Sequence, residues 1–226
     1  MRNPLRPLPL LVLLPFVLAC ASTRVAPQDR GEREEEVTAG MMVMVVDDLP
    51  NLVFEGLSRA AAKTTMVTAT VPTYTTITAV TGLTPPSVDF YSPRTGDENN
   101  LATFGAYLYA YNLPKDNDFH VIIGDTPTFT AGVTNLINVE VSGRPDKTDT
   151  VFKAVRNQFL AIIGNPTTMS YGTYTCMPLP IAITVSGGPF WDVSHKGGGS
   201  GTSTCYGGVQ MKTINGWELH PVNSIQ

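Results

Sequence analysis

The chain has 226 residues, of which 42% are hydrophobic and 15% charged, and its formal net charge is −4 at pH 7. This length suits one ordinary domain with additional segments, since soluble domains usually contain about 100–200 residues. After residue 20, no stretch contains the roughly 18 or more consecutive apolar residues that predict a membrane-spanning helix. A net-negative chain is a poor electrostatic partner for phosphate backbones, so the composition disfavours nucleic-acid binding.

The N-terminus has the pattern of a secretory signal. Arg2 and Arg6 precede an apolar run over residues 8–19, which is short for a membrane span. The run ends in Val-Leu-Ala-Cys at residues 17–20, which resembles the bacterial lipobox. We therefore expect residues 1–19 to be a signal peptide and Cys20 to carry the lipid. The alternative is an ordinary signal that is cut before an incidental cysteine.

The residues after Cys20 predict a tether and a location. Residues 20–39 are polar, with GEREEE at their centre, and predict a disordered linker between lipid and domain. A non-acidic Ala21 resembles the outer-membrane sorting pattern of Gram-negative lipoproteins. Removal of the signal with its two arginines changes the net charge from −4 to −6. The expected partner of the N-terminus is thus a membrane, reached through the lipid anchor.

Two further cysteines, Cys176 and Cys205, remain in the predicted mature chain. An even pair in an exported protein favours a disulfide. The bond would close a loop of about 30 residues, worth roughly 3–4 kcal/mol in the chain-entropy model. The alternative is a pair of free buried thiols.

Residues 40–100 predict a β-rich extension followed by a loop. We expect a short helix at 52–63 and two Thr- and Val-rich strands at 66–71 and 75–81, forming a hairpin or an edge extension. Prolines and GDENN make residues 84–100 a loop.

Residues 101–226 predict a mainly β domain with one helix. Period-two alternation indicates strands, whereas apolar residues at helical spacing, ended by Gly164, indicate a helix. The expected elements are strands at 103–112, 119–123 and 134–141, the helix at 151–162 after a cap at Thr148 or Asp149, a strand at 179–186 with a second piece at 190–193, and a strand at 217–222. A single helix between the third and fourth strands favours an OB-fold-like five-stranded Greek-key barrel. A β-sandwich with one incidental helix is the rival.

Four segments of this domain resemble a group of secreted bacterial proteins. The group's pattern contains a DGDYHLVL-like strand, an AEIP-like strand, a GFFDFLHG-like piece and a terminal IELHPV. The matching segments are DNDFHVII (116–123), NVEV (138–141), GGPFWDVSH (187–195) and WELHPV (217–222). This chain departs from the pattern at Val141-Ser142, where the group has Ile-Pro, and in a glycine-rich insertion at 196–208. The resemblance implies the fold and an exported location, but no activity.

One face of the predicted sheet gathers ionisable side chains. In an OB-like strand order they are His120, Glu140, Glu218 and His220, with Asp118 beside them. His120, Glu140 and His220 could bind a divalent metal such as Zn²⁺ or Mn²⁺. Asp118 or Glu218 could then act as a base. The alternative is a structural network of cross-strand His–Glu hydrogen bonds, each worth about 0.2–1 kcal/mol.

Aromatic residues supply a second candidate site. Tyr107, Tyr109 and Tyr111 alternate along the first strand and could form an exposed row that stacks on a sugar or contacts a partner protein. The alternative is that residues 40–90 cover these tyrosines. Trp191, in the segment at 187–208, is a further binding candidate. The glycines of that segment lack the strand-to-helix context of a phosphate-binding loop and predict a flexible linker.

These observations favour a lipid-anchored extracytoplasmic module that binds or supports other components of the cell envelope, either protein or saccharide. The alternative is a metal-dependent, nuclease-like hydrolase that uses the histidine face. The chain contains neither GxSxG nor HExxH, so it carries neither of these signatures of other hydrolases.

Overall fold

The computed structural model describes residues 43–45, 59–114, 117–143, 150–170, 172–195, 202–206 and 209–226. The predicted signal peptide, Cys20 and the tether lie outside these residues. Among the described helices, none combines the length and apolar character needed to cross a membrane.

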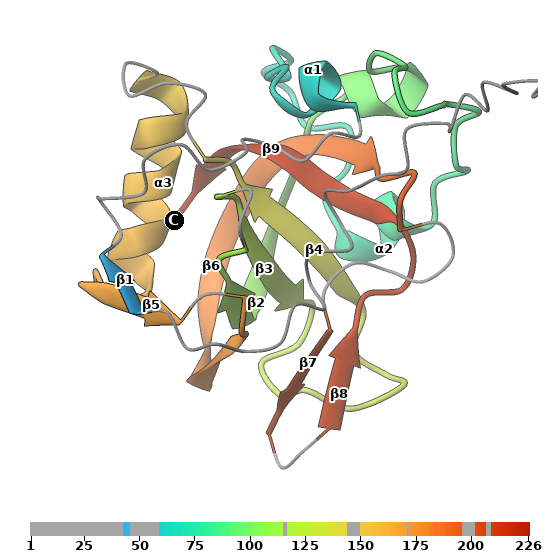
Figure 1. The fold of residues 1–226 in the computed structure, drawn as a ribbon. Helices are drawn as coiled ribbons and strands as arrows, with labels where there is room; N and C mark the ends of the chain where they lie inside the picture. Colours follow the sequence, from blue (N-terminus) through green and yellow to red (C-terminus); the bar gives the residue numbers. More distant parts are fainter. Residues whose placement is uncertain are drawn as a thin grey trace, which may run out of the picture.

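Five strands form one mixed sheet (Figure 1). They pair in the order β2-β3-β4-β9-β6, and β6 also pairs with β2, so the sheet closes on itself. β4 and β9 are parallel, whereas the other neighbours are antiparallel. The strands are β2 (Ala102–Asn112), β3 (Phe119–Gly124), β4 (Leu136–Val141), β6 (Thr175–Trp191) and β9 (Trp217–Ile225).

The expected helix is α3 (Thr150–Ile162), which lies between β4 and β6 in the chain. Phe152, Val155 and Phe159 recur at helical spacing and are all buried. Gly164, with φ of 86°, follows the last turn in the left-handed conformation that glycine adopts readily. A mainly β fold, with a five-stranded mixed sheet and a helix between the third and fourth strands of that sheet, is thereby confirmed.

The fourth strand is longer than predicted. Residues 179–186 and 190–193 were expected as two pieces, but Thr175–Trp191 is one strand, β6. Its register with β9 shifts between Ser186 and Gly187 and again before Pro189. These irregularities let one continuous strand pair with both β2 and β9, which periodicity alone does not reveal.

The predicted hairpin over 66–71 and 75–81 is wrong. Within the described part of residues 40–100, the structure has α1 (Ala60–Lys63), α2 (Ile77–Thr81) and η2 (Gly96–Asn99), and the strand described there is β1 (Val43–Val45), paired with β5 (Thr168–Ser170). The Thr76 side chain accepts a hydrogen bond from the Ala79 N–H and caps α2. Ile77 and Val80, three residues apart, are buried against the sheet, so tertiary packing selects a helix despite the β-branched residues. Of the helix expected at 52–63, residues before 59 lie outside the described chain.

The sheet has apolar clusters on both of its faces. The larger cluster fills the interior and includes Phe119, Val139 and Leu219. A second cluster joins Ile122 and Leu136, on the opposite face, to residues of the β7–β8 segment. Two described strands, β7 (Thr202–Cys205) and β8 (Val209–Lys212), form a hairpin. β7 lies within residues 187–208, where a flexible linker was expected, so that prediction is corrected for this strand. In Figure 1 the hairpin projects from the end of the sheet remote from α1.

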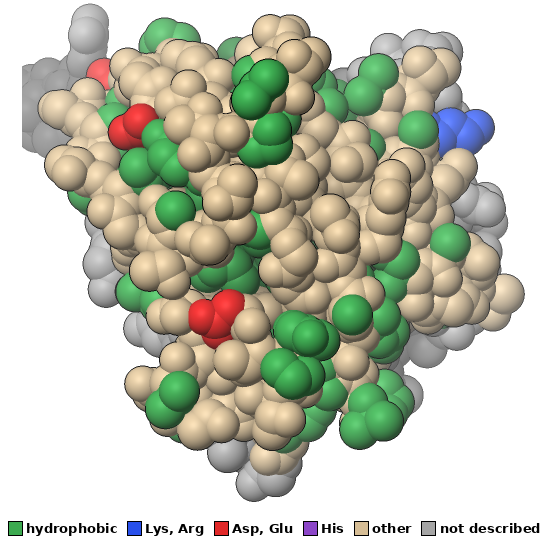
Figure 2. Space-filling model, turned by 180° about the vertical axis from the view of Figure 1, so that it is seen from behind, with side chains coloured by type: hydrophobic (Ala, Val, Ile, Leu, Met, Phe, Trp, Pro, Cys, Tyr) green, Lys and Arg blue, Asp and Glu red, His purple; other side chains and the backbone are tan. Residues whose placement is uncertain are grey.

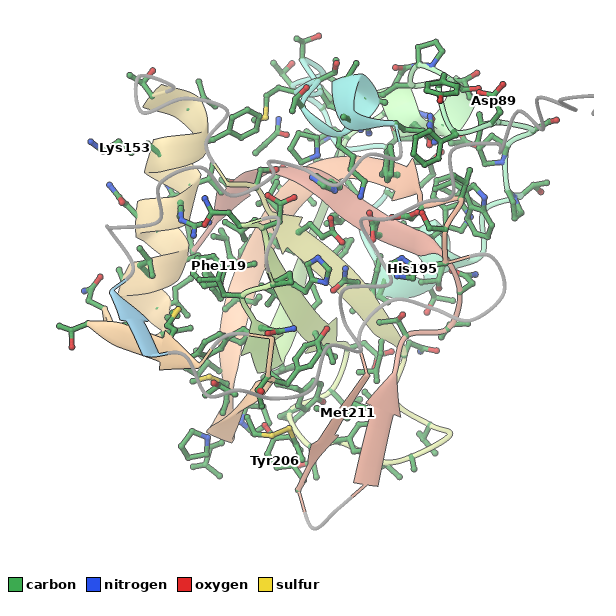
Figure 3. The ribbon with its side chains drawn as sticks, in the orientation of Figure 1. Asp89, Phe119, Lys153, His195, Tyr206 and Met211 are labelled. Carbon is green, nitrogen blue, oxygen red and sulfur yellow. A yellow bond between two sulfur atoms is a disulfide. The ribbon has the colours of Figure 1, made fainter. Side chains whose placement is uncertain are left out.

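Cys176 of β6 and Cys205 of β7 form a disulfide (Figure 3). Cys205 is buried, and Tyr206 and Met211 pack beside it in the second apolar cluster. The bond therefore ties the hairpin to the sheet.

We expect the Cys176→Ala, Cys205→Ala double variant to lose about 3–4 kcal/mol of unfolding free energy, because the cysteines are 29 residues apart and the bond restricts the unfolded chain. Urea unfolding followed by tryptophan fluorescence measures this change. Reduced wild-type protein is the matched comparison and should lose a similar amount. Equal stability of the variant and the oxidised wild type would contradict the prediction.

Candidate functional site

Alternation along β3, β4 and β9 sends large apolar side chains inward and polar side chains to the other face. Cross-strand register then aligns the polar residues: His120 lies opposite Glu140, and Asn138 lies opposite Glu218. The sequence predicted that the ionisable residues converge, but not that they are enclosed. In the structure these four residues, and His220, are at most 6% exposed.

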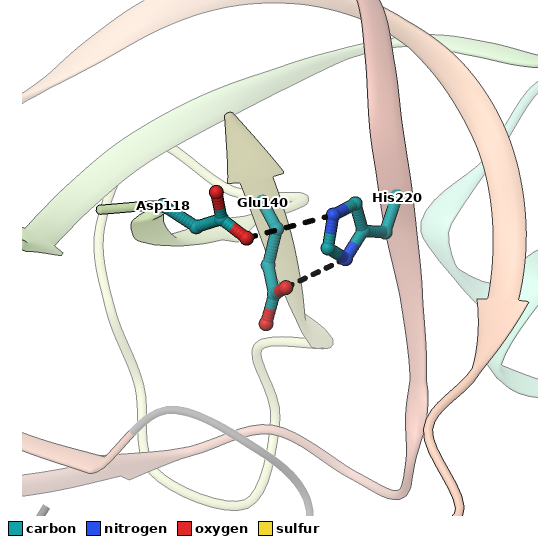
Figure 4. Close-up of side chains that lie close together, drawn as sticks. All are labelled: Asp118, Glu140 and His220. Carbon is teal, nitrogen blue, oxygen red and sulfur yellow. Dashed lines mark ion pairs between the residues drawn. The ribbon is translucent and has the colours of Figure 1, made fainter. Parts of the chain in front are cut away.

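Asp118, Glu140 and His220 form the tightest group (Figure 4). One possible ligand atom from each lies within 4.8 Å of the others. The His220 ring stands between the two carboxylates: Nδ1 is 2.6 Å from Glu140 Oε2, and Nε2 is 3.8 Å from Asp118 Oδ2. Asp118 also accepts a hydrogen bond of 2.5 Å from the Gly143 N–H, which fixes its position.

The remaining predicted residues surround this group. His120 Nε2 is 3.4 Å from Glu140 Oε1, and Glu218 Oε1 is 3.5 Å from His220 Nδ1. Asn138 donates to Glu140 and Glu218, at 3.0 and 3.3 Å. The predicted ligand set of His120, Glu140 and His220 is thus brought together, but the compact group contains Asp118 in place of His120.

Sequence reasoning missed three residues that complete the cluster. Asp192 and His195 follow β6, with Asp192 Oδ2 3.5 Å from His195 Nδ1. Lys63 of α1 lies 3.3 Å from Asp192 and 4.0 Å from Glu140. The segment with Asp192 and His195 was visible in the sequence as GGPFWDVSH, whereas the approach of Lys63 had no local signal. All three histidines of the chain belong to this cluster.

Residues 59–98, which place Lys63 of α1 against this cluster, are called the cover. A buried ion pair between Arg59 and Glu98 helps to attach the cover to the sheet. Arg59 donates to both oxygens of Glu98, each at 2.6 Å. Its other donors reach the carbonyl oxygens of Ser92, Pro93 and Trp191. The five N–H groups of the guanidinium are thereby all used, and Glu98 also accepts the Trp191 N–H. Residues 59–98 are thus bound to β6 through charged hydrogen bonds.

Arg94 makes a second attachment. It donates to the carbonyl oxygens of Pro189 and His220, both at 2.6 Å, and so spans β6 and β9. A Cβ at Gly188 would lie 2.2 Å from the Arg94 guanidinium, so glycine is required for this approach. The guanidinium groups of Arg59 and Arg94 lie 4.6 and 5.7 Å from the Phe190 ring centroid, in the range of cation–π attraction.

Burial and neighbouring charges shift the pKa values of two carboxyl groups in opposite directions. Burial and the nearby Glu140 carboxylate raise the pKa of Glu218. Burial also raises the pKa of Glu140, but His120, Lys63 and His220 outweigh it, and the pKa lies well below its usual value. Burial lowers the pKa of Arg94 to about 10, so that side chain stays charged at neutral pH.

The exposed tyrosine row that the sequence predicted is not found. The register of β2 shifts between Leu108 and Ala110, which breaks the alternation. Tyr109 and Tyr111 are therefore buried in different apolar clusters. Tyr107 is partly buried, and Trp191, 8% exposed, packs edge-on against Trp217. Tyr109 is covered by Phe129 and Tyr206, which come from a loop and from the hairpin segment.

The arrangement has the donor types of a divalent-metal site. Carboxylate oxygen and imidazole nitrogen together suit Zn²⁺ or Mn²⁺. An imidazole between two carboxylates can give one nitrogen to a metal and donate from the other to a carboxylate. Without a metal it can protonate and bridge both. No described histidine is visible on the side of the molecule shown in Figure 2.

Comparison of the chain with protein-family models, with curated proteins and with solved structures gave no match. The functional argument therefore depends on the sequence and on the geometry of the site.

Replacement of Arg59 by Met should cost about 3–5 kcal/mol of unfolding free energy, because Glu98 would remain as a buried, unpaired charge. Urea denaturation measures the loss. The double variant Arg59→Met, Glu98→Leu should recover much of it, since both charges are then removed. Lys153→Ala, at an exposed position of α3, is the control and should change stability by less than about 0.5 kcal/mol. Similar values for Arg59→Met and Lys153→Ala would refute this role of the ion pair.

Proposed function

We propose that this protein is an exported, lipid-anchored module of the bacterial cell envelope that holds a divalent metal ion on the covered polar face of its sheet. The metal would be part of the folded structure. The signal-like N-terminus, the Cys20 motif and the disulfide pair support export, because disulfides persist in oxidising compartments.

The observation that carries the metal proposal is burial. Asp118 and His220 are 0% exposed and Glu140 is 1% exposed, within 4.8 Å of one another. Buried carboxylates require a compensating charge, and a divalent cation supplies it in one place. The absence of solvent exposure favours a structural ion over a catalytic one, because a substrate would have to displace the cover to reach it.

We also propose that the closed sheet is an OB-like Greek-key barrel. The support is the strand order, the helix between the third and fourth strands, and the parallel pairing of the third with the fifth. Envelope proteins or saccharides are the proposed partners, since the net charge of −6 expected after signal removal disfavours nucleic acid.

A metal-dependent hydrolase is the second candidate. It is favoured by Glu218, whose pKa is raised by burial and by Glu140, as a general acid or base requires. For this function, the cover formed by residues 59–98 would have to move away from the site so that a substrate could enter.

We expect the full chain, purified without chelator, to contain a divalent transition metal, one equivalent of which is lost in His220→Gln and retained in His120→Gln. His220 belongs to the compact group, whereas His120 contacts it from outside through Glu140. Inductively coupled plasma mass spectrometry measures the metal, and circular dichroism checks that each variant is folded.

If His220→Gln retains the metal and His120→Gln loses it, this ligand set is replaced by one centred on His120. If wild-type protein binds no metal even after incubation with Zn²⁺, the metal proposal fails, and the cluster is a structural polar network only.

The anchor is tested separately. Wild-type protein expressed in a Gram-negative host should incorporate labelled palmitate and sediment with membranes, because the lipobox cysteine is the acylation site. Cys20→Ala should lose both properties. Unchanged labelling in the variant would exclude Cys20 as the lipidated residue.

A further inference from the structure

We infer that Asp192, His195 and Glu218 form a second divalent-cation site beside the first, one that exchanges its ion with solvent. This inference deepens the proposed metal-binding function, although it depends on different side chains. One possible ligand atom from each of these residues lies within 4.8 Å of the others.

The backbone holds the three residues in place. Asp192 donates its N–H to the Gly216 carbonyl at 2.9 Å, and Asp192 Oδ1 accepts the Ser194 N–H at 2.8 Å. The His195 N–H donates to the Asp192 carbonyl at 3.3 Å, which closes a turn. Glu218 stands on β9 opposite Phe190, at the end of the β6 ladder from which this turn departs. Two of the ligands thus come from one fixed turn and the third from the adjacent strand.

The carboxylate of Asp192, a member of this group, is buried. Asp192 is 0% exposed, and its Oδ2 lies 3.5 Å from His195 Nδ1. Lys63 Nζ lies 3.3 Å from that oxygen and 4.0 Å from Glu140 Oε2. The ammonium therefore stands between the two carboxylate groups, which shows that the space favours positive charge. Although burial raises the pKa of Asp192, Lys63 and His195 outweigh it, so the carboxylate is ionised and suited to a cation.

The two sites differ in access. The His195 side chain is 16% exposed, whereas the His220 side chain is 0% exposed. An ion at Asp192, His195 and Glu218 would therefore leave more readily than one held by Asp118, Glu140 and His220. Glu218 Oε1 also lies 3.5 Å from His220 Nδ1, so the two sites adjoin through this carboxylate.

The test uses the full chain, stripped with chelator and then titrated with Zn²⁺ alone. Bound metal is counted by mass spectrometry after gel filtration, and its release is followed with a chromogenic chelator. Wild-type protein should bind two equivalents and release them in a fast and a slow phase. His195→Gln should keep the slow equivalent, and His220→Gln the fast one. Lys153→Ala, at an exposed position of α3 outside the cluster, is the control and should keep both. Asp192→Asn repeats the test through a second ligand.

The outcomes separate this inference from the proposed function. If His195→Gln and Asp192→Asn bind as much Zn²⁺ as the wild type, with the same release phases, the second site does not exist and Asp192–His195 is an ion pair only. A single equivalent that depends on His195 and not on His220 would support the second site and reject the first. No bound Zn²⁺ in the wild type would reject both.

Discussion

The structure depends on the cover that residues 59–98 place over the polar face of the sheet, and the Arg59–Glu98 ion pair fastens that cover. Burying a guanidinium is tolerable only when its donors are all used, and here the five acceptors come from Glu98 and from three carbonyl groups. One of these carbonyls belongs to Trp191, at the end of β6. The cover is therefore joined to the same strand end that leads to Asp192 and His195.

The face opposite the interior core is divided into two parts with different chemistry. Towards the β7–β8 hairpin it is apolar, with Ile122 and Leu136 packed against the disulfide-linked segment. Towards α1 it carries carboxylates and histidines, and the cover brings cations to them. The residues of β3 and β4 are buried on both faces, as are most residues of β9, whereas the first part of β6 is largely exposed. This division explains why the pKa values of two neighbouring carboxyl groups are shifted in opposite directions, with that of Glu140 lowered and that of Glu218 raised.

The strands and the main helix could be predicted from local pattern because each repeats its apolar residues over several positions. Residues 66–81 could not, since Thr- and Val-rich segments suit a strand intrinsically, while contact of Ile77 and Val80 with the sheet selects a helix. The prediction of an exposed tyrosine row was wrong for a related reason, because one register shift in β2 turns Tyr111 to the other face of the sheet. Such shifts are set by pairing with β3 and β6, and they leave no signal in the sequence.

By itself, the sequence determined the five strands of the sheet, the helix between the third and fourth, and the cysteine pair. It also determined that His120, Glu140 and Glu218 share a face, because period-two alternation fixes which side chains of a strand lie on the same side. Only the tertiary structure decided that this face is buried, that Asp118 joins Glu140 and His220, and that Lys63, Asp192 and His195 complete the cluster. The physical reason is that burial and long-range charge pairing depend on segments distant in the chain, whose approach no local periodicity encodes.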